Sequence, residues 1–339
     1  MPAAAGLGLD THREIGLAPN VAKKLRKITR MRLAPRLEAA ARPGQMCGIQ
    51  HKGVDIASLH VQAFFQACRR YHRAGAALFA DVKQAFYRLH RDVVLAVDGL
   101  EPGTPRADAV ATSLLARIGV EPHLVALVSA YHCGTHFAVG LHPDRALFAV
   151  GLLPGDTLAD MIFNIAALHA LNGIEAAFQA GGILPYHFPE PRELWIATDA
   201  AAAPIVDVSH VDDDAFLIQG EPLAIPGLLC KAVVLLHGVL EPMGLAIHLG
   251  EGKTEAVVSL HGRGTRAATR GIFVDCAGAL ALPAPLAPAK LFIKRCYKHL
   301  GTLLGGDLSF DPEVTARVFP LPPLSLPSAG GRQFLTVPS

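Results

Sequence analysis

Three consecutive aspartates, Asp212, Asp213 and Asp214, stand between two apolar runs in the second half of this 339-residue chain. The flanking runs, Ile205–Val208 and Ala215–Ile218, have strand character, which predicts that the acids lie in the tip of a β-hairpin. Carboxylates this close together repel each other unless a cation lies between them. Their hard oxygen ligands favour Mg²⁺ or Mn²⁺. The stretch therefore indicates either a metal site or a solvated acidic turn.

Another strand-like run, Ala77–Ala80, ends at a single acid, Asp81, and a helical pattern follows it. An aspartate at such a junction is commonly a helix N-cap. Together with the distant acids it can instead complete a metal site. We then expect the carboxylates of Asp81 and Asp212 to lie within about 6 Å of each other.

The two acidic stretches together resemble motifs A and C of the reverse transcriptase palm. Phe79-Ala80-Asp81, followed by Ala85-Phe86, is similar to the first motif, which is an aromatic residue, any residue and Asp, then an Ala-Phe pair. His210-Val211-Asp212-Asp213 is similar to the second, with His where the family has Tyr or Phe. The residues after Asp213 fit the family's next positions, which favours this register over Asp213-Asp214.

Two more stretches in the family's order resemble its nucleotide-binding segments. Arg13-Glu14-Ile15 is similar to the fingers motif of the non-LTR retrotransposon branch, whose Arg contacts the triphosphate of the incoming nucleotide. Gly151–Asp160 is similar to motif B, a glycine turn that opens a helix, although Pro154 replaces the usual Gln. A glycine turn lets the backbone approach a ligand closely.

The last two motifs follow the hairpin. Gly252-Lys253 is similar to motif D, whose Lys lies near the triphosphate, and His248 stands where Asn is usual. A P-loop is excluded here, because a Walker A motif needs Gly at the position that Ile247 occupies. Tyr297–Gly301 is similar to motif E, the turn that holds the primer end. The resemblance spans residues 13 to 305.

The resemblance implies an α+β polymerase palm, an antiparallel sheet backed by helices with a ferredoxin-like core and partial fingers. The implied activity is that of an RNA-directed DNA polymerase, which adds dNTPs to a DNA primer on an RNA template with two Mg²⁺ (or Mn²⁺) ions. The implied catalytic residues are Asp81, Asp212, Asp213 and Lys253, and the metal ligands are the three aspartates with the carbonyl of Val82. The implied substrate contacts are Arg13, Gly155 and Phe86, the last as a steric gate against the 2′-hydroxyl; a core Phe is the alternative reading.

A densely basic helix is predicted from Val21, which with Leu25 and Ile28 has helical spacing. No acid interrupts its basic positions, and such an uncompensated stripe favours a phosphate backbone as partner, with a solvated helix face as the alternative. The implied nucleic-acid contacts are Lys23, Lys24, Arg26, Lys27, Arg30, Tyr297 and Gly301.

The domain organisation of the chain is predicted from its composition and its turn signals. Residues 1–75 are expected to form partial fingers with the basic helix, residues 76–305 a palm with a Gly/Pro/Ala-rich insert at 181–204, and residues 306–339 a Pro-rich tail without a thumb. Further helices are predicted over 56–71, 107–118 and 122–132, with a hairpin over 135–150. The apolar stretch 222–240 contains Lys231 and His237, so we expect a buried helix and not a membrane span.

Bulk composition excludes little. The net charge of +2 neither supports nor excludes a nucleic-acid partner. Six scattered cysteines without a C-x-x-C pair argue against a zinc ribbon and favour a reducing, intracellular compartment. Two other functions stay open: a catalytically inactive reverse-transcriptase-like relic that binds RNA or protein, and a nucleotide-binding α/β enzyme, which predicts a parallel sheet. Oligomeric state is not predicted.

Overall fold

The computed structural model describes residues 20–46, 49, 52–95, 112–133, 136–138, 145–147, 150–153, 155–186, 205–210 and 213–307. Several positions from the sequence analysis lie outside these ranges: Arg13, Pro154, Asp212, most of the 181–204 insert and the tail beyond residue 307. Predictions that rest on them remain predictions.

The fold is a mixed α+β structure built on a mostly antiparallel sheet. Its strand order is β4-β5-β1-β7-β9-β8, and β6 also pairs with β1. The strands are β1 (Ala74–Lys83), β4 (Asp207–His210), β5 (Asp213–Gly220), β6 (Ala246–Ile247), β7 (Glu255–Ser259), β8 (Ala279–Ala281) and β9 (Lys290–Lys294). Among these strands only β7 and β9 run parallel. The α/β alternative, which requires a parallel sheet, is therefore wrong.

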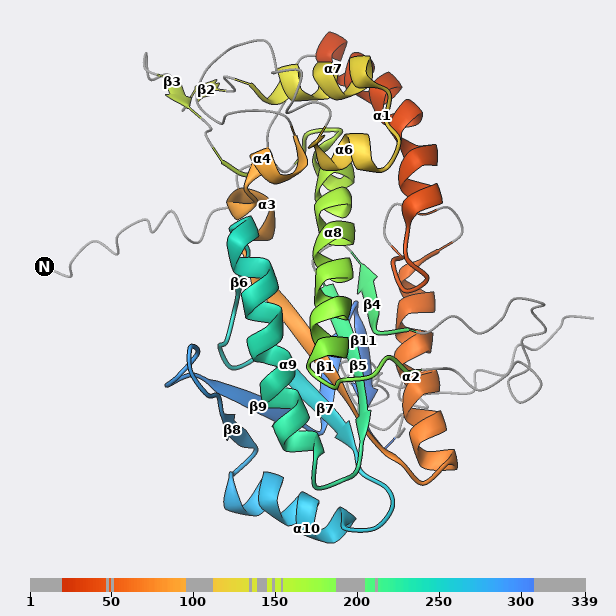
Figure 1. The fold of residues 1–339 in the computed structure, drawn as a ribbon, viewed down its shortest axis with the longest axis vertical. Coiled ribbons are helices and arrows are strands. Elements are labelled where there is room, and N and C mark those ends of the chain that lie inside the picture. The colour runs from red at the N-terminus through yellow and green to blue at the C-terminus, as the bar shows by residue number, and fades with distance from the viewer. Residues whose placement is uncertain are drawn as a thin grey trace, which may run out of the picture.

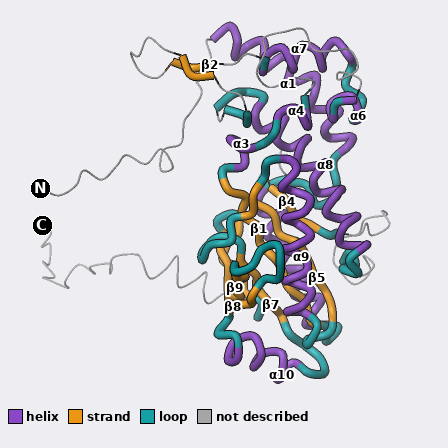
Figure 2. Tube along the Cα trace, turned by 60° about the vertical axis from the view of Figure 1, so that its left-hand side comes forward, coloured by secondary structure: helices purple, strands orange, loops and turns teal. Residues whose placement is uncertain are grey.

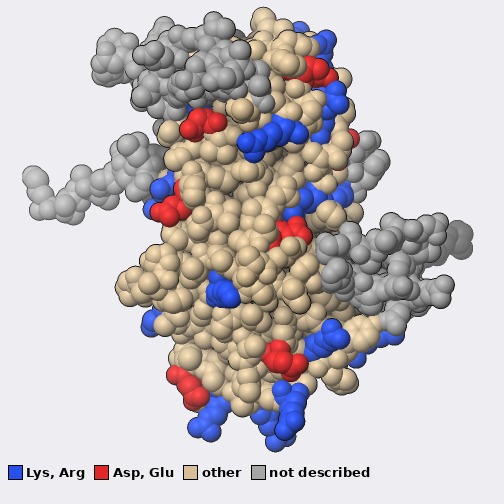
Figure 3. Space-filling model, in the orientation of Figure 1, with Lys and Arg blue, Asp and Glu red and all other residues tan. Residues whose placement is uncertain are grey.

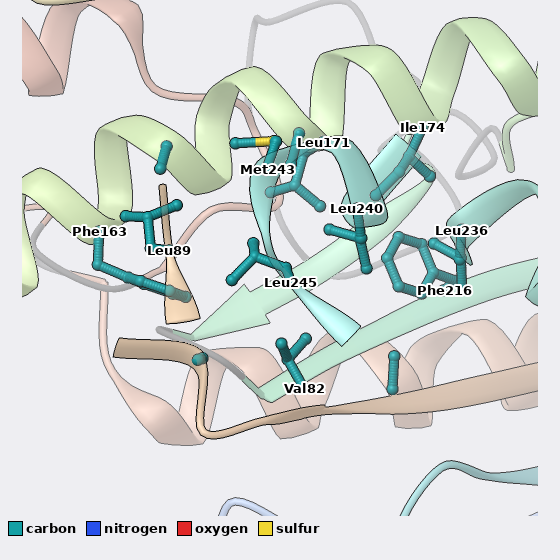
Figure 4. Packing of buried hydrophobic residues seen from close by; sticks show 14 of the residues in the cluster. Val82, Leu89, Phe163, Leu171, Ile174, Phe216, Leu236, Leu240, Met243 and Leu245 are labelled. Atoms are coloured by element: carbon teal, nitrogen blue, oxygen red, sulfur yellow. The ribbon is translucent and has the colours of Figure 1, made fainter. Parts of the chain in front are cut away.

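Both faces of the sheet are covered, which explains why β1 reads as a continuous apolar run. Leu78 and its neighbours on one face of β1 pack with α8 (Ala159–Ala180) and α9 (Ile225–Leu240) in the larger core. Figure 4 shows part of this core, where Val82 and Phe216 of the sheet lie among side chains from both helices and the turn after α9. Phe79, on the opposite face, packs with α2 (Val54–Arg70) in a second core.

Most of the remaining helices gather at one end of an elongated molecule, and the strands of the main sheet lie at the other end (Figures 1 and 2). The long helix α8 joins the two ends. The end opposite the sheet contains α3 (Ala85–Arg88), α4 (Arg91–Val94), α6 (Leu114–Arg117), α7 (Pro122–His132) and the start of α1 (Asn20–Ala40), with the hairpin β2 (His136–Ala138) and β3 (Arg145–Leu147). The sheet end also contains α10 (Thr265–Arg270) and the π-turn Gly271–Asp275. The 3₁₀ turn Glu241–Met243 follows α9 and lies beside the start of α4, where Met243 O accepts a hydrogen bond from His90 N.

Most predicted elements are confirmed. The structure contains the helices expected over 56–71 and 122–132, both predicted hairpins and the helix after the glycine turn. The helix expected over 107–118 is described only from residue 112, and there only four residues are α-helical, Leu114–Arg117.

The buried face of α1 is not the one that contains Val21, Leu25 and Ile28. Val21, Leu25 and Ile28 are 72%, 51% and 53% exposed, whereas Thr29, Leu33 and Leu37 face the core. The periodicity correctly indicated a helix. It did not indicate the buried side, because the exposed side is also apolar.

Within the part of the chain that the structure describes, two helices are long and apolar enough to cross a membrane by length and composition alone, α8 and the segment Ile225–Met243. Both contribute many side chains to the larger core and pack against the sheet. The face of the molecule over these two helices carries few charges (Figure 3). In their most apolar windows, 61% of α8 and 33% of the segment Ile225–Met243 is buried inside the protein.

Candidate active site

Asp81 and Asp213 are placed side by side by the pairing of β1 with β5. In this antiparallel ladder Asp81 lies directly opposite Asp213, and Phe79 lies opposite Ala215. Side chains of opposed residues share a face of the sheet, with Cβ atoms about 4.5–5.5 Å apart. Two like charges in this arrangement destabilise the sheet unless a cation lies near them.

The strand alternation also separates the three consecutive aspartates. Asp214 is opposite Ala80, so it lies on the other face of the sheet, where it lines a small cavity with Phe163 and Leu245. Asp212 belongs to the two-residue connection between β4 and β5 and is outside the described residues. Of the two acid pairs considered from the sequence, the pair Asp213-Asp214 therefore includes an acid that lies on the opposite face of the sheet from Asp81.

Two side chains from the loop after β6 reach the same oxygen of Asp81. Lys253 Nζ is 3.3 Å from Asp81 Oδ2, and His248 Nδ1 is 3.4 Å from it. The loop is held in place by the backbone of Asp81, whose carbonyl accepts a hydrogen bond from His248 N at 2.8 Å. The buried Thr254 hydroxyl accepts a hydrogen bond from Asp81 N at 3.1 Å. The structure thus brings Lys253, which was expected near the triphosphate, into contact with Asp81.

A third carboxylate, which the sequence analysis did not identify, lies on the same face. Glu255 of β7 is directly opposite Phe79, two positions before Asp81 along β1. It is buried, and it accepts a hydrogen bond from Gly252 N at 2.7 Å, which fixes the turn that carries Lys253. Lys294 Nζ lies 3.5 Å from it. The available signal was the apolar run Ala256–Val258, which places Glu255 at the start of a strand.

Tyr297 covers this acidic face. It belongs to the hairpin of β10 (Cys296–His299) and β11 (Thr302–Gly305), and its ring stacks on Phe79 with centroids 4.3 Å apart. Burial, and then the charges of Asp213, Asp81 and Glu255, raise the pKa of Tyr297 to about 12. Its hydroxyl donates a hydrogen bond to Lys253 O at 3.2 Å. The tyrosine stays neutral at physiological pH and packs beside the acids.

The turn at the tip of the same hairpin requires two left-handed residues. Leu300 has φ 50° and Gly301 has φ 87°, as in a two-residue type I′ connection. Glycine adopts this conformation without steric cost, whereas Leu300 does not. The segment that resembles motif E is therefore a tight hairpin against the acidic face.

A pocket of about 530 Å³ lies where the end of β1 meets the glycine turn. Phe86, Gly155 and Thr157 line it, together with Lys27 and Arg30 of α1 and with Asp156 and Asp160. Phe86 is half-buried, and its ring stacks on Phe163 with centroids 4.7 Å apart. The structure thus gathers Phe86 and Gly155, the two predicted substrate contacts among the described residues, in one pocket.

The expectation that the basic helix has no compensating acids is wrong. Arg26 pairs with Asp156 at 2.7 Å, and Arg30 forms a two-pronged contact with Asp160. Arg36 pairs with Glu121 at 2.6 Å. These acids lie far from α1 in the sequence, so no local charge count could reveal them. The cations of α1 best placed to meet phosphate are Lys23, Lys24, Lys27 and the exposed Arg32.

Arg42, just after α1, was missed by the sequence analysis. It is mostly buried between Asp207 and Glu175, with an ion-pair distance of 2.7 Å to each. The chain then runs beside β4, where Met46 N donates to Ser209 O at 2.8 Å. Gln45 is buried, and its Nε2 donates to Asn164 O at 3.2 Å. The bond from Met46 to Ser209 fixes the edge of the hairpin that carries the aspartates, and the Gln45 bond ties the same segment to α8.

The residues present fit a divalent cation in part. Asp81 and Asp213 supply carboxylate oxygens, and Asp81 Oδ2 is buried without a hydrogen-bond partner. Within the residues that the structure describes, no group of three or more His, Cys, Asp or Glu side chains could hold a metal ion. An ion at this edge would take further ligands from water and substrate phosphates, as Mg²⁺ commonly does.

Neither a family model nor a curated protein matches the sequence. Among solved structures, the chain is similar to telomerase from Candida albicans in a complex with a fragment of telomeric RNA, with a TM-score of 0.37 and 15% sequence identity. The match covers 70% of this chain and 34% of the telomerase chain, so the chain spans about a third of that length. A likeness this low carries no weight for function.

Proposed function

We propose that the chain is a reverse-transcriptase-type palm that transfers deoxynucleotides to a primer 3′-hydroxyl on an RNA template. The observation that carries the proposal is the β1–β5 register, which sets Asp81 directly opposite Asp213 on one face of an antiparallel sheet. The two acids come from the two stretches that resemble motifs A and C. Lys253 and Tyr297, from the stretches that resemble motifs D and E, lie beside the same acids.

In this proposal the protein positions the reactants and neutralises charge. Two bound Mg²⁺ or Mn²⁺ ions would supply charge neutralisation at the attacking and leaving oxygens. Asp81, Asp212, Asp213 and the carbonyl of Val82 would hold them. Lys253 is placed to give a proton to the leaving pyrophosphate as a general acid. Phe86 and Gly155 would line the site of the sugar, in the pocket that α1 closes.

Primer extension tests the proposal. The full chain is incubated with a primer annealed to RNA, dNTPs and either Mg²⁺ or Mn²⁺. Asp81→Asn and Asp213→Asn should each reduce the rate by at least about 100-fold, the scale on which loss of one electrostatic contributor acts. Asp275→Asn, at an exposed acid in the π-turn, is the matched control and should not change the rate. Equal rates in all four proteins would refute the proposal.

A second candidate, a reverse-transcriptase-like protein that binds RNA or protein without catalysis, is favoured by one feature of α1. Arg26 and Arg30 are engaged by Asp156 and Asp160 at the pocket, while Val21 and Ile28 expose apolar side chains beside Lys24. Such a surface fits a binding role. Nucleic-acid binding without any extension in either metal would favour this candidate.

A further inference from the structure

A cluster of cations lies at the sheet end of the molecule, where the end of α2 meets the loop between β7 and α10. These two segments supply four arginines and two histidines, which we call the arginine surface: Arg69, Arg70, His72, Arg73, His261 and Arg263. The segments are in contact, since a Cβ built on Gly262 would lie 2.7 Å from His72 O. Figure 1 shows both of them at the same end of the molecule.

The positive charges of the arginine surface are not neutralised by acids. Within the part of the chain that the structure describes, Arg69, Arg73 and Arg263 are exposed and form no ion pair. Burial, and then the charges of Arg69 and His72, lower the pKa of His261. The helix dipole favours basic residues in the last turn of α2, but it does not explain why a distant loop adds Arg263 beside them. The surface therefore has a positive potential that an anionic partner would neutralise.

An aromatic side chain lies among these charges. Tyr71 is 40% exposed, and the guanidinium of Arg70 lies 5.8 Å from the centre of its ring. Exposed aromatic rings beside arginines are typical of surfaces that bind single-stranded nucleic acid, because bases stack on the ring and guanidinium groups meet the phosphates. An acidic peptide could meet the charges, but it offers the ring no planar base. The combination of charge and ring therefore favours a nucleic acid.

We propose that the arginine surface binds a single strand of nucleic acid, with phosphates at Arg69, Arg73 and Arg263 and an unstacked base at Tyr71. The proposal goes beyond the proposed function and does not rest on it. The arginine surface lies at the start of β1, whereas Asp81 lies near its end, so about 26 Å of strand separates them at about 3.3 Å per residue. A short duplex at the acids can contact α1 without reaching this surface.

Fluorescence anisotropy tests the proposal. A labelled oligouridine RNA of about 12 nucleotides, within the range of known single-strand sites, is titrated with the full chain across a salt series. The variant Arg69→Gln/Arg73→Gln/Arg263→Gln should weaken binding at least about tenfold at about 0.1 M salt. It should also lower the slope of log Kd against log salt by about 2, at about 0.7 for each lost contact.

A second triple variant controls for net charge. Arg117→Gln/Lys231→Gln/Lys290→Gln also removes three exposed cations, but from α6, α9 and β9, and should change Kd by less than about threefold. Equal losses in the two triple variants would overturn the proposal, because binding would then follow net charge alone. The DNA oligomer of the same length is titrated in parallel. The tighter of the two identifies the preferred sugar, and failure of both to bind overturns the proposal.

Tyr71→Ala tests the place of the base. It should weaken binding of the oligomer at least about fivefold, the lower end of the effect of losing one stacked base. It should leave unchanged the affinity for inorganic polyphosphate, which has phosphates but no bases. Equal loss of both ligands, or no loss of either, would show that no base stacks on Tyr71 and would overturn the proposal. Polyglutamate that binds as tightly as the RNA would overturn it in favour of an acidic protein partner.

Discussion

Gly151 shows how one residue fixes the geometry of the pocket. Its φ is +78°, and a Cβ built on it would lie 2.2 Å from the carbonyl oxygen of Tyr87. Its N–H donates to Leu89 O at 2.9 Å. The glycine turn can therefore lie directly against the segment that carries Phe86 only while position 151 has no side chain.

Gly151→Ala should lower the free energy of unfolding by about 2–4 kcal/mol, because steric overlap with the Tyr87 backbone adds to the cost of a positive φ. Gly182→Ala is the matched control: its φ is +74°, but nothing lies within 4 Å of its Cβ position. We expect it to cost about 1–2 kcal/mol. Urea denaturation measures both. Equal losses of unfolding free energy in the two variants would mean that the Tyr87 backbone moves away from the added Cβ at no cost.

Phe86 forms a wall of the same pocket, and its proposed role is to exclude the 2′-hydroxyl. Phe86→Val should raise the use of rNTPs relative to dNTPs by about tenfold or more, since it removes the ring that fills this space. Single-nucleotide extension rates with each sugar give the ratio. Phe178→Val, a fully buried core substitution, should reduce stability but leave the ratio unchanged. An unchanged ratio in Phe86→Val would make Phe86 a packing residue only.

Helix α1 is joined to the start of α8 by charges that line the pocket. Arg30 contacts both the Asp160 carboxylate and Thr157 O, the latter at 2.8 Å. These partners occupy a guanidinium that could otherwise meet the phosphates of a ligand. The contact between the two helices and the charge of the pocket are therefore linked.

Asp160→Asn should tighten binding of a dNTP by about 3–10-fold, because it removes a negative charge from the pocket and releases Arg30 for phosphate. Glu121→Gln releases Arg36 in the same way, but outside the pocket lining, and should leave dNTP affinity unchanged. Calorimetric titration of dNTP into each protein measures the effect. Weaker binding by Asp160→Asn would mean that the ion pair is needed to form the pocket.

At the scale of elements, periodicity predicted most of the fold. Strand β1, helices α2 and α7, and both hairpins follow from local patterns, because their residues respond to immediate neighbours. Pairing partners could not be derived in the same way. Glu255 faces the acids only through the register of β7 on β1, and Asp156 meets Arg26 across 130 positions. The sequence predicted that Asp81 and Asp212 converge, whereas the place of Asp213 directly opposite Asp81 follows only from the register of β5 on β1.

At the scale of the whole molecule, few cations on α1 are available for nucleic acid. With three arginines paired, the contacts left there come from Lys23, Lys24, Lys27 and Arg32. We expect weak binding of a primer–template, with log Kd rising about 2–4 units per log unit of salt, at about 0.7–0.9 for each contact. The double variant Lys24→Ala/Lys27→Ala should lower this slope by about 1.5–2. Lys290→Ala, at an exposed site on β9, should not lower it. Tight binding that persists at high salt would locate the interface elsewhere.

Stability should also depend on pH through two buried histidines. Burial lowers the pKa of His132 and of His299 to about 4, and nearby His210 contributes at His299. Between pH 6.5 and 4 the unfolded chain binds protons that the folded chain does not, so the free energy of unfolding falls as pH falls. Each histidine contributes up to about 3 kcal/mol over this window.

Urea denaturation at several pH values between 7 and 4.5 measures the decline. His299→Phe, which removes one titrating ring, should give a shallower dependence of stability on pH than the wild type. An identical dependence of stability on pH in the variant and the wild type would mean that His299 titrates in the same way in the folded and unfolded states.

The central position of β1 in the sheet has a consequence for folding during translation. Its hydrogen-bonding partners on the two edges, β5 and β7, come from residues 213–220 and 255–259. At about 5–20 residues per second, a ribosome leaves both edges of β1 open for roughly 10 s. Throughout that interval Ala74–Lys83 presents an apolar, proline-free strand, the kind of segment that pairs with other chains. The strand that carries Asp81 is thus the segment where aggregation during translation is expected to begin, and where a chaperone would act.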